Sequence, residues 1–506
     1  MLTPYYLADV PLPVVALYQE LEDYILADIS RRIAKAGKIT DTAAWQVMRA
    51  QEIGAGMDKI QKEVARINGM SSRAVSKIFD DSAVRSAKYD DAIYRRAGLD
   101  PPAFRQSPYM IKYMQAASEK TFGTLTNLTG SMGFAQEVGG RVTFGDIAKT
   151  YQSALDFAHL QVASGAADQR TATRQAIKKL ADSGIRTVDY KTGWSNHLDV
   201  AVTRAVRTGV SQMAGELSLM RGREMGIYTM EITAHAGARP THAVWQGRVV
   251  DTSGNDSRYL TLSDIGYGDV AGFKGANCRH DWFPFVPGAS VPVYSARQLS
   301  RLDPDPIDYG GKVYTYYNAT QRQRQIETAI RKTKREIVSY EAAGLSDDMA
   351  MAAAKLQRQK QLYMDFSDAA NIRPKLDRTQ VYGYNKSVAQ KTVWAARKAG
   401  TPKTAKAPDT RLHVKLDYDI IKKTGRKQGV IPRGADITNV RVIAGQGTST
   451  PLKAADKLTE QYGGGEAWEW QKKVGTVYSK YDRYEVHWYE LNGEQFDVKL
   501  KGWKER

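Results

Sequence analysis

The sequence is poor in cysteine, since Cys278 is the single one among 506 residues. No disulfide can therefore form within the chain, and the fold suits a reducing compartment such as the cytoplasm. Long apolar runs are also missing, because no stretch of about 18 apolar residues occurs. The first residues, MLTPYYLADV, lack a basic segment followed by an apolar core. These absences argue against a membrane span and against secretion.

Negative charge is in short supply relative to positive charge. The chain has 73 Lys and Arg against 55 Asp and Glu, which gives a net charge of +18. Such an excess favours a polyanionic neighbour such as nucleic acid, although a basic surface without a ligand is the alternative. Hydrophobic residues make up 42% and charged residues 25%, as in globular proteins. A chain of this length is expected to form two to four domains.

The pattern along the chain predicts a multidomain α+β fold. Residues 1–195 are expected to be mostly helical, with apolar residues at helical spacing before a stop at Gly37. A further helix is predicted over 197–225, ending at Gly226. From Ile227 the residues favour strands and turns, so 196–317 is expected to be a compact, loop-rich α+β core domain.

The second half of the sequence predicts three further segments. Residues 318–372 are expected to form a helical hairpin that turns at Gly344, with Ser346 capping its second helix. Residues 373–410 are interpreted as a basic linker, because six basic residues and no acidic one lie between Lys386 and Lys406. Strand patterns return afterwards, so 411–506 is predicted to be a small, β-rich α+β domain.

A group of imidazole and thiol side chains occurs in the core segment. Residues 235–247 read HAGARPTHAVWQG and residues 275–288 read GANCRHDWFPFVPG, which places His235, His242, Cys278 and His280 in one domain. Four such residues can complete a tetrahedral zinc site. The spacing matches no standard zinc finger, and the alternative is that the histidines satisfy backbone groups while Cys278 is a small buried residue.

Enzymatic chemistry has little support in this core. A lone Cys near His residues can act as a nucleophile, but its surroundings carry no hydrolase signature. No Walker loop, HExxH or EF-hand pattern occurs, so the core is expected to be non-enzymatic.

The core does resemble a known family. Arg204, Arg207 and Thr208 on a predicted helix, followed by HAGARPTHAVWQG and GANCRHDWFPF, are similar to the tailed-phage minor capsid proteins related to Mu F and other head morphogenesis proteins, of the minor capsid protein 2 type. The resemblance implies a virion protein, made in the host bacterial cytoplasm and situated in the capsid interior or at the portal vertex. It implies portal and capsid proteins as partners, packaged DNA nearby, and a role in head assembly or genome delivery.

The C-terminal segment carries a second resemblance. The stretches AGQGTSTP, WQKKVG and YEVHWYE resemble nuclease-like domains appended to phage head proteins and polymorphic toxins. The ending YEVHWYELNGEQFDVKLKGW is expected to form two strands joined by a three-residue turn, Leu491 to Gly493. This register pairs Trp488 with Phe496 and Val486 with Val498.

On the other face, that register sets His487 opposite Asp497 and Glu485 opposite Lys499, beside Tyr489. A histidine oriented by a carboxylate, with Glu and Lys nearby, has the groups for general acid and base cleavage of RNA without a metal. Lys472 and Lys473 are predicted to add phosphate contacts. The alternative functional hypothesis is therefore an effector delivered by the virion, whose C-terminal domain is a ribonuclease. An inert domain with a charged hairpin face is the competing interpretation.

Overall fold

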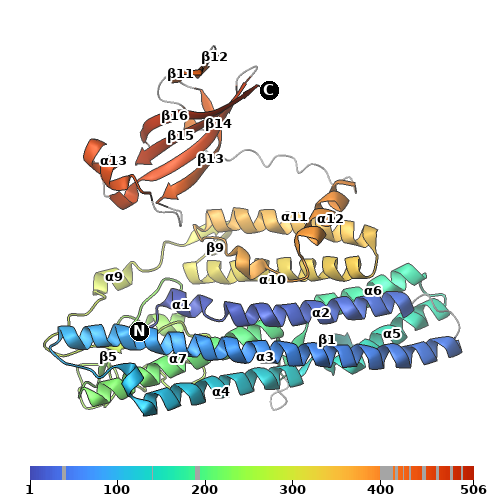
Figure 1. Cartoon of the computed structure of the whole chain (residues 1–506), viewed down its shortest axis with the longest axis horizontal. Coiled ribbons are helices and arrows are strands. Elements are labelled where there is room, and N and C mark those ends of the chain that lie inside the picture. Colours follow the sequence, from blue (N-terminus) through green and yellow to red (C-terminus); the bar gives the residue numbers. More distant parts are fainter. Residues whose placement is uncertain are drawn as a thin grey trace. The chain divides into compact units, whose positions relative to one another are not determined.

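The computed structural model describes residues 1–36, 42–138, 141–188, 194–398, 414–415, 420–424, 427–431, 435–446, 452–462, 467–478, 482–491 and 494–505. The chain divides into two compact units, Met1–Gly400 and Thr401–Arg506 (Figure 1). Helices and several small antiparallel sheets confirm the multidomain α+β class. The predicted helix stop at Gly37, the turn residues Asn492 and Gly493, and residues 399–410 of the predicted linker lie outside the described residues.

Helices dominate the first unit, and the longest of them run lengthwise side by side (Figure 1). They are α1 (Pro4–Asp9), α2 (Leu12–Ala36), α3 (Thr42–Arg96), α4 (Pro108–Gly130), α5 (Ile147–Ala163), α6 (Gln169–Ser183), α7 (Leu198–Glu224), α8 (Pro240–Ala243), α9 (Ala296–Ser300), α10 (Tyr316–Ala342), α11 (Ser346–Ala369) and α12 (Lys386–Lys398), with short 3-10 turns η1 (Phe104–Gln106) and η2 (Leu376–Thr379).

Helix α2 shows how the apolar spacing becomes a core. Leu21, Ile25, Ile29 and Ile33 recur every fourth residue, lie on one face of the helix and are fully buried. They belong to one hydrophobic cluster that also takes in side chains of α3, α4, α7, α10 and α11. The N-terminal helices, α7 and the hairpin therefore share a single core.

Helix α7 ends where a glycine permits a left-handed turn. Gly226 has a φ of 69°, its N–H donates to the Arg223 carbonyl, and the Ile227 N–H donates to the Gly222 carbonyl. These two hydrogen bonds satisfy carbonyl groups in the last turn of the helix. Gly344, with a φ of 72°, closes α10 in the same way. The predicted capping role of Ser346 is wrong, because Leu345 holds the cap position and makes no side-chain cap bond.

Small sheets connect the helices of this unit. Strands β1 (Met132–Val138), β2 (Arg141–Asp146), β3 (Arg186–Val188) and β4 (Ser195–His197) form an antiparallel sheet in the order β2-β1-β3-β4. Strands β5 (Thr229–Ile232), β6 (Val249–Asp251) and β7 (Trp282–Pro284) form a second one with β5 in the centre. Strands β8 (Ile307–Tyr309) and β9 (Lys312–Tyr314) pair by themselves. The β5 sheet has its own apolar cluster, which includes Trp245, Phe273, Cys278 and Trp282.

The second unit is built on a five-stranded antiparallel sheet in the order β10-β13-β14-β15-β16, with a separate β11-β12 pair. Its elements are β10 (Val414–Lys415), β11 (Ile420–Thr424), β12 (Lys427–Ile431), β13 (Asp436–Gly445), α13 (Ala455–Tyr462), η3 (Ala467–Glu469), β14 (Gln471–Tyr478), β15 (Asp482–Leu491) and β16 (Glu494–Glu505). Within the described residues of the whole chain, no helix is long and apolar enough to cross a membrane.

The predicted register of the last two strands is wrong. Leu491 pairs with Glu494, which leaves two residues between them instead of three. Register shifts follow along the ladder, one of them near Asp497, whose φ is 49°. A bulge of this kind inserts an extra residue into one strand. The shift lets Val486 pair with Leu500 and keeps the apolar side chains in one buried cluster despite the shorter turn.

A buried ion pair links two helices of the first unit. The Arg335 Nη1 atom on α10 lies 3.2 Å from Oε2 of Glu22 on α2, and both side chains are buried. The Glu22 Oε1 atom also accepts a hydrogen bond from the Ile185 N–H at 2.8 Å. Burial raises the pKa of Glu22, and the Arg335 charge opposes that rise. Arg335 therefore compensates a carboxylate that has little contact with water.

We expect the substitution Arg335→Ala to lower the free energy of unfolding by about 3–5 kcal/mol, because it leaves Glu22 buried without its counter-charge. Urea denaturation of the full chain, followed by circular dichroism, measures the change. Arg358 on α11 is exposed and is the matched control, since Arg358→Ala should change stability by no more than about 0.5 kcal/mol. Equal losses in the two variants would contradict the proposed role of Arg335.

Candidate metal centre

The β5 sheet brings distant parts of the sequence together. Ile232 pairs with Trp282, and the ladder continues as the Thr233 N–H donates to the Asp281 carbonyl at 2.8 Å. The segment after β5, which carries His235, therefore lies beside the segment before β7, which carries Cys278 and His280. His242 comes from the short helix α8, which begins at Pro240. A proline at this position fits because the first N–H of a helix has no partner within it.

Three of the four predicted metal ligands converge. The Cys278 Sγ atom lies 3.8 Å from His242 Nδ1 and 3.6 Å from His280 Nδ1. One possible ligand atom from each residue lies within 4.8 Å of the others, and all three residues are buried. We call His242, Cys278 and His280 the metal centre. Its geometry allows one cation to contact two imidazoles and one thiolate.

Hydrogen bonds fix the orientation of both imidazoles. His242 Nε2 lies 2.8 Å from the Ala271 carbonyl oxygen, and His280 Nε2 lies 3.2 Å from Gln246 Oε1. Both oxygens are acceptors, so each Nε2 carries the proton and each Nδ1 presents a lone pair toward Cys278 Sγ. A thiol proton can satisfy one of these lone pairs but not both. Metal-binding histidines are commonly held by such bonds to the second ring nitrogen.

Burial sets the protonation states. It lowers the pKa of His242, and together with neighbouring His235 it holds the pKa of His280 well below the usual range. The two histidines are therefore neutral at physiological pH, as metal ligands must be. Burial raises the pKa of the Cys278 thiol. Binding of a cation consequently has to displace the thiol proton.

His235 lies beside the three ligands rather than among them. Its ring stacks on the His280 ring, with centroids 4.5 Å apart. Its Nδ1 is 2.8 Å from the Ala236 carbonyl oxygen and 3.4 Å from an Nη2 of Arg279. Burial and the Arg279 charge lower the pKa of His235 to about 4. The ring thus supports His280, and three of the four predicted ligand residues lie close enough together to contact one cation.

Sequence reasoning missed the residues around the ligands. Gln246 orients His280, and the Trp245 ring lies 4.5 Å from the His242 ring and 4.9 Å from the His280 ring. Trp245 and Gln246 follow His242 by three and four residues in the quoted motif, so the motif itself was the available signal. Because the three residues are buried and Cys278 and Trp245 belong to the apolar cluster of the β5 sheet, the arrangement suits a structural ion.

The predicted catalytic residues of the second unit are only partly brought together. His487 Nε2 lies 3.0 Å from Glu485 Oε1 on the same strand, and Lys499 pairs opposite His487. The predicted pairing of His487 with Asp497 and of Glu485 with Lys499 is wrong, because the bulges shift the register. Glu485 pairs opposite Gly502 instead.

The remaining predicted residues make other contacts. Asp497 accepts a hydrogen bond from the Tyr462 hydroxyl at 2.9 Å, and its Oδ2 lies 3.5 Å from Lys499 Nζ. Tyr489 packs against the apolar cluster around Trp470. Lys472 lies over the Tyr489 ring, and Lys473 forms an ion pair with Glu490. His487 and Glu485 thus form the pair that can exchange a proton, and Lys499 lies opposite His487.

The comparisons with known proteins identify the class of this chain. It is 27% identical over 202 residues to a protein of Lactococcus phage LL-H described as a structural protein, covering 39% of this chain and 52% of that protein. It is 28% identical over 101 residues to a structural protein of Lactococcus phage mv4, covering 20% of this chain and 73% of that protein. The chain thus spans about half the length of the LL-H relative. These relatives are virion components.

The family follows from a longer match. The sequence profile of phage minor capsid protein 2 matches residues 2–368, which is more than half of the chain. The chain therefore belongs to the phage minor capsid protein 2 family. The matched residues include the whole metal centre and end before the second unit begins. No solved structure matches the chain.

We expect the full chain, purified from cells supplied with zinc, to contain about one zinc ion per molecule by elemental analysis. Cys278→Ser should lose the ion, because a hydroxyl at this position does not form the anionic ligand. His235→Gln is the matched control and should keep it, since His235 is outside the ligand group. Release of zinc should increase as the pH falls, because protons compete for the thiolate. A folded wild-type chain without zinc would contradict the metal centre.

Proposed function

We propose that this protein is an internal component of the phage head that acts in head assembly or genome delivery, next to the portal and the packaged DNA. The family match over residues 2–368 is the observation that carries the proposal, because it covers the core and nearly all of the helices of the first unit. Portal and capsid subunits are the partners that this role requires, and the capsid interior or the portal vertex is its place in the virion.

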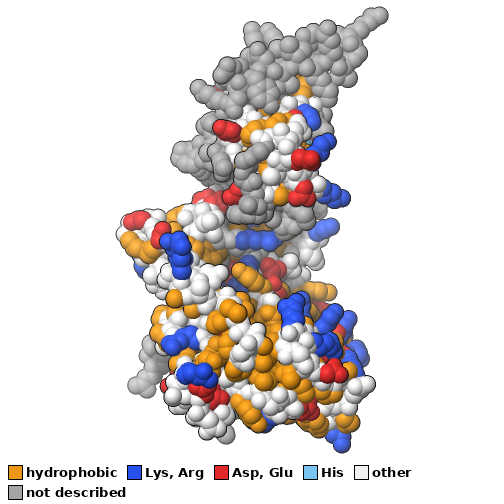
Figure 2. All heavy atoms as spheres, turned by 90° about the vertical axis from the view of Figure 1, so that its left-hand side faces the viewer, with side chains coloured by type: hydrophobic (Ala, Val, Ile, Leu, Met, Phe, Trp, Pro, Cys, Tyr) orange, Lys and Arg blue, Asp and Glu red, His pale blue; other side chains and the backbone are white. Residues whose placement is uncertain are grey.

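The surface of the first unit suits contacts with other subunits. Figure 2 shows hydrophobic side chains gathered over much of the visible face of this unit, with lysines and arginines between them. Large apolar side chains such as Val244, Val270 and Val291 are more than two-thirds exposed. Exposed apolar patches are typical of interaction surfaces. The net charge of +18 favours a position near packaged DNA.

We further propose that the metal centre holds a structural zinc ion. An ion bound by His242, Cys278 and His280 would tie α8 to the segment before β7. Such a link would stabilise the fold of a segment that has little regular structure and so few backbone hydrogen bonds between strands.

We expect the protein to be present in heads assembled with portal and absent from heads assembled by a phage that lacks the portal gene. The portal occupies the one vertex of the head that differs from the others. A protein that binds only at this vertex is incorporated in few copies, and it is not incorporated when the portal is missing. Immunoblotting of purified heads measures this, with the major capsid protein as the loading control. Equal amounts in the two kinds of head would refute portal-dependent incorporation. Detection only in the free lysate would refute the head location altogether.

A second candidate function is RNA cleavage by the Thr401–Arg506 unit, delivered by the virion. The 3.0 Å contact between His487 Nε2 and Glu485 Oε1 favours it, because a carboxylate that accepts from a histidine can orient it and raise its basicity. Lys499, opposite His487, can stabilise charge on a phosphate. This activity needs no metal.

If the unit is a ribonuclease, the purified full chain should cut single-stranded RNA in the presence of EDTA, and His487→Ala should lower the rate by about 100-fold or more. Gel analysis of labelled RNA measures the rate. Lys453 lies in the same unit, away from His487 in the sequence and on no strand, and Lys453→Ala is the control. Cleavage by His487→Ala at the wild-type rate would exclude His487 as the catalytic group, whereas no cleavage by the wild type would leave an inert domain.

A further inference from the structure

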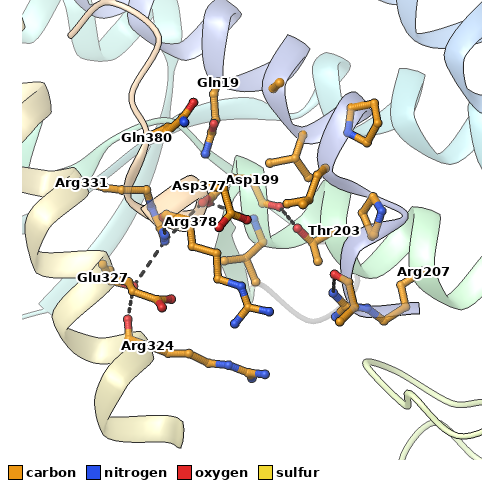
Figure 3. Close-up of a pocket in the computed structure, with 18 of the residues that line it drawn as sticks. Gln19, Asp199, Thr203, Arg207, Arg324, Glu327, Arg331, Asp377, Arg378 and Gln380 are labelled. Carbon is orange, nitrogen blue, oxygen red and sulfur yellow. Dashed lines mark hydrogen bonds and ion pairs between the residues drawn. The ribbon is translucent and has the colours of Figure 1, made fainter. Parts of the chain in front are cut away.

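A second site with charged residues lies in the first unit, apart from the ligands of the metal centre. It is a pocket of about 480 Å³, lined by the start of α2 and by residues of α1, α7, α10 and η2 (Figure 3). Its volume is in the range of small-molecule sites. Arginines are prominent among its lining residues: Arg207, Arg324, Arg331 and Arg378.

Among the described residues, four arginines in and beside this pocket are not engaged in ion pairs. Within the described part of the chain, Arg207, Arg279, Arg324 and Arg378 form no ion pair with any carboxylate, and we call them the arginine cluster. Burial lowers the pKa of Arg207 to about 9, with repulsion from the other three adding to the effect. These guanidinium groups are therefore close enough to repel one another.

The acidic residues of the pocket are mostly engaged elsewhere. Asp199 lies 3.3 Å from Arg331, which is outside the arginine cluster. Glu327 accepts a hydrogen bond from the Tyr363 hydroxyl at 2.8 Å. Burial raises the pKa of Glu327, and this hydrogen bond and the nearby charges of Arg378 and Arg324 oppose that rise. Asp377 is exposed to solvent. The four guanidinium groups of the arginine cluster outnumber the carboxylates whose charges act on them, Asp9 on Arg207 and Glu327 on Arg324 and Arg378. Part of the positive charge of the cluster is consequently left uncompensated inside the protein.

Two of the four guanidinium groups are available to a ligand. Arg207 donates to the carbonyl oxygens of Leu7 and Ala8 at 2.7 and 3.0 Å, which hold it in place. Figure 3 shows the guanidinium groups of Arg324, on α10, and Arg378, on η2, pointing into the same space. Within the described residues neither group makes a hydrogen bond or an ion pair, and Arg324 is exposed to solvent.

We propose that this pocket is a binding site for a phosphate group, which Arg324 and Arg378 contact directly while Arg207 and Arg279 add positive charge. A guanidinium group can bind a phosphate through two parallel hydrogen bonds, one to each of two phosphate oxygens. A phosphate carries more charge than a carboxylate and has more oxygens, so it suits a cluster of four cations better. The group can belong to a nucleic acid or to a free phosphate compound. This proposal stands independently of the proposed role in the head.

Isothermal titration calorimetry of the full chain tests the site, with inorganic phosphate and a 5′-phosphorylated DNA oligonucleotide as separate probes at constant ionic strength. Both Arg324→Gln and Arg378→Gln should weaken binding at least tenfold. Arg322→Gln is the matched control, because Arg322 is on the same helix but lines a different hollow. In the unliganded protein, Arg324→Gln should not lower the melting temperature, since it removes a repelling charge.

The two probes distinguish the sources of the phosphate. Oligonucleotide binding that depends on Arg324 and Arg378 assigns the site to nucleic acid. Inorganic phosphate binding that depends on them, with oligonucleotide binding unchanged in the variants, assigns it to a free phosphate compound. Binding of neither probe, or binding that is equal in wild type and both variants, overturns the proposal. Neither probe would bind specifically if the arginine cluster instead forms ion pairs with an acidic side chain of another virion protein, and the proposal would then be overturned.

Discussion

The loop-rich segment between β6 and β7 depends on one buried ion pair, between Lys274 and Asp281, whose side chains are 1% and 0% exposed. The Lys274 Nζ atom also donates to the Ser211 carbonyl on α7 at 2.9 Å. Gly215 makes this possible, because a Cβ there would lie 2.3 Å from Lys274 Cε. Breaking a buried pair leaves an isolated charge away from water, which is costly. The pair therefore fastens an otherwise irregular segment to the central helix α7.

Because Lys274 and Asp281 are fixed, the residues between them are held in place as well. Cys278 and His280 belong to the metal centre, whereas Arg279 belongs to the arginine cluster and the Asn277 Oδ1 atom accepts a hydrogen bond from Arg207 of that cluster. Asn277 has a φ of 61°, a left-handed conformation that asparagine tolerates better than most residues. Four consecutive residues thus serve two sites. Rigid support of this kind is what keeps side chains in a productive geometry without regular secondary structure.

The sequence predicted the parts of the fold that depend on local patterns. Apolar periodicity and Gly226 located α7, and the motifs placed His242, Cys278 and His280 in one domain. The strand register near His487 was wrong because a bulge at Asp497 changes which residues face each other, and no local pattern encodes its position. The arginine cluster escaped notice because Arg324 and Arg378 are on polar segments far from Arg207 and meet it only after the helices have packed.

The two sites are also linked electrostatically. Arg279 lowers the pKa of His235 and contributes to the low pKa of His280, so this one member of the arginine cluster helps keep both imidazoles neutral. The His235 ring connects Arg279 and His280, because it contacts Arg279 and stacks on the His280 ring. A divalent cation in the metal centre would add positive charge beside Arg279 and so strengthen the attraction for an anion in the pocket. Because such coupling is reciprocal, a bound phosphate would in turn favour retention of the cation.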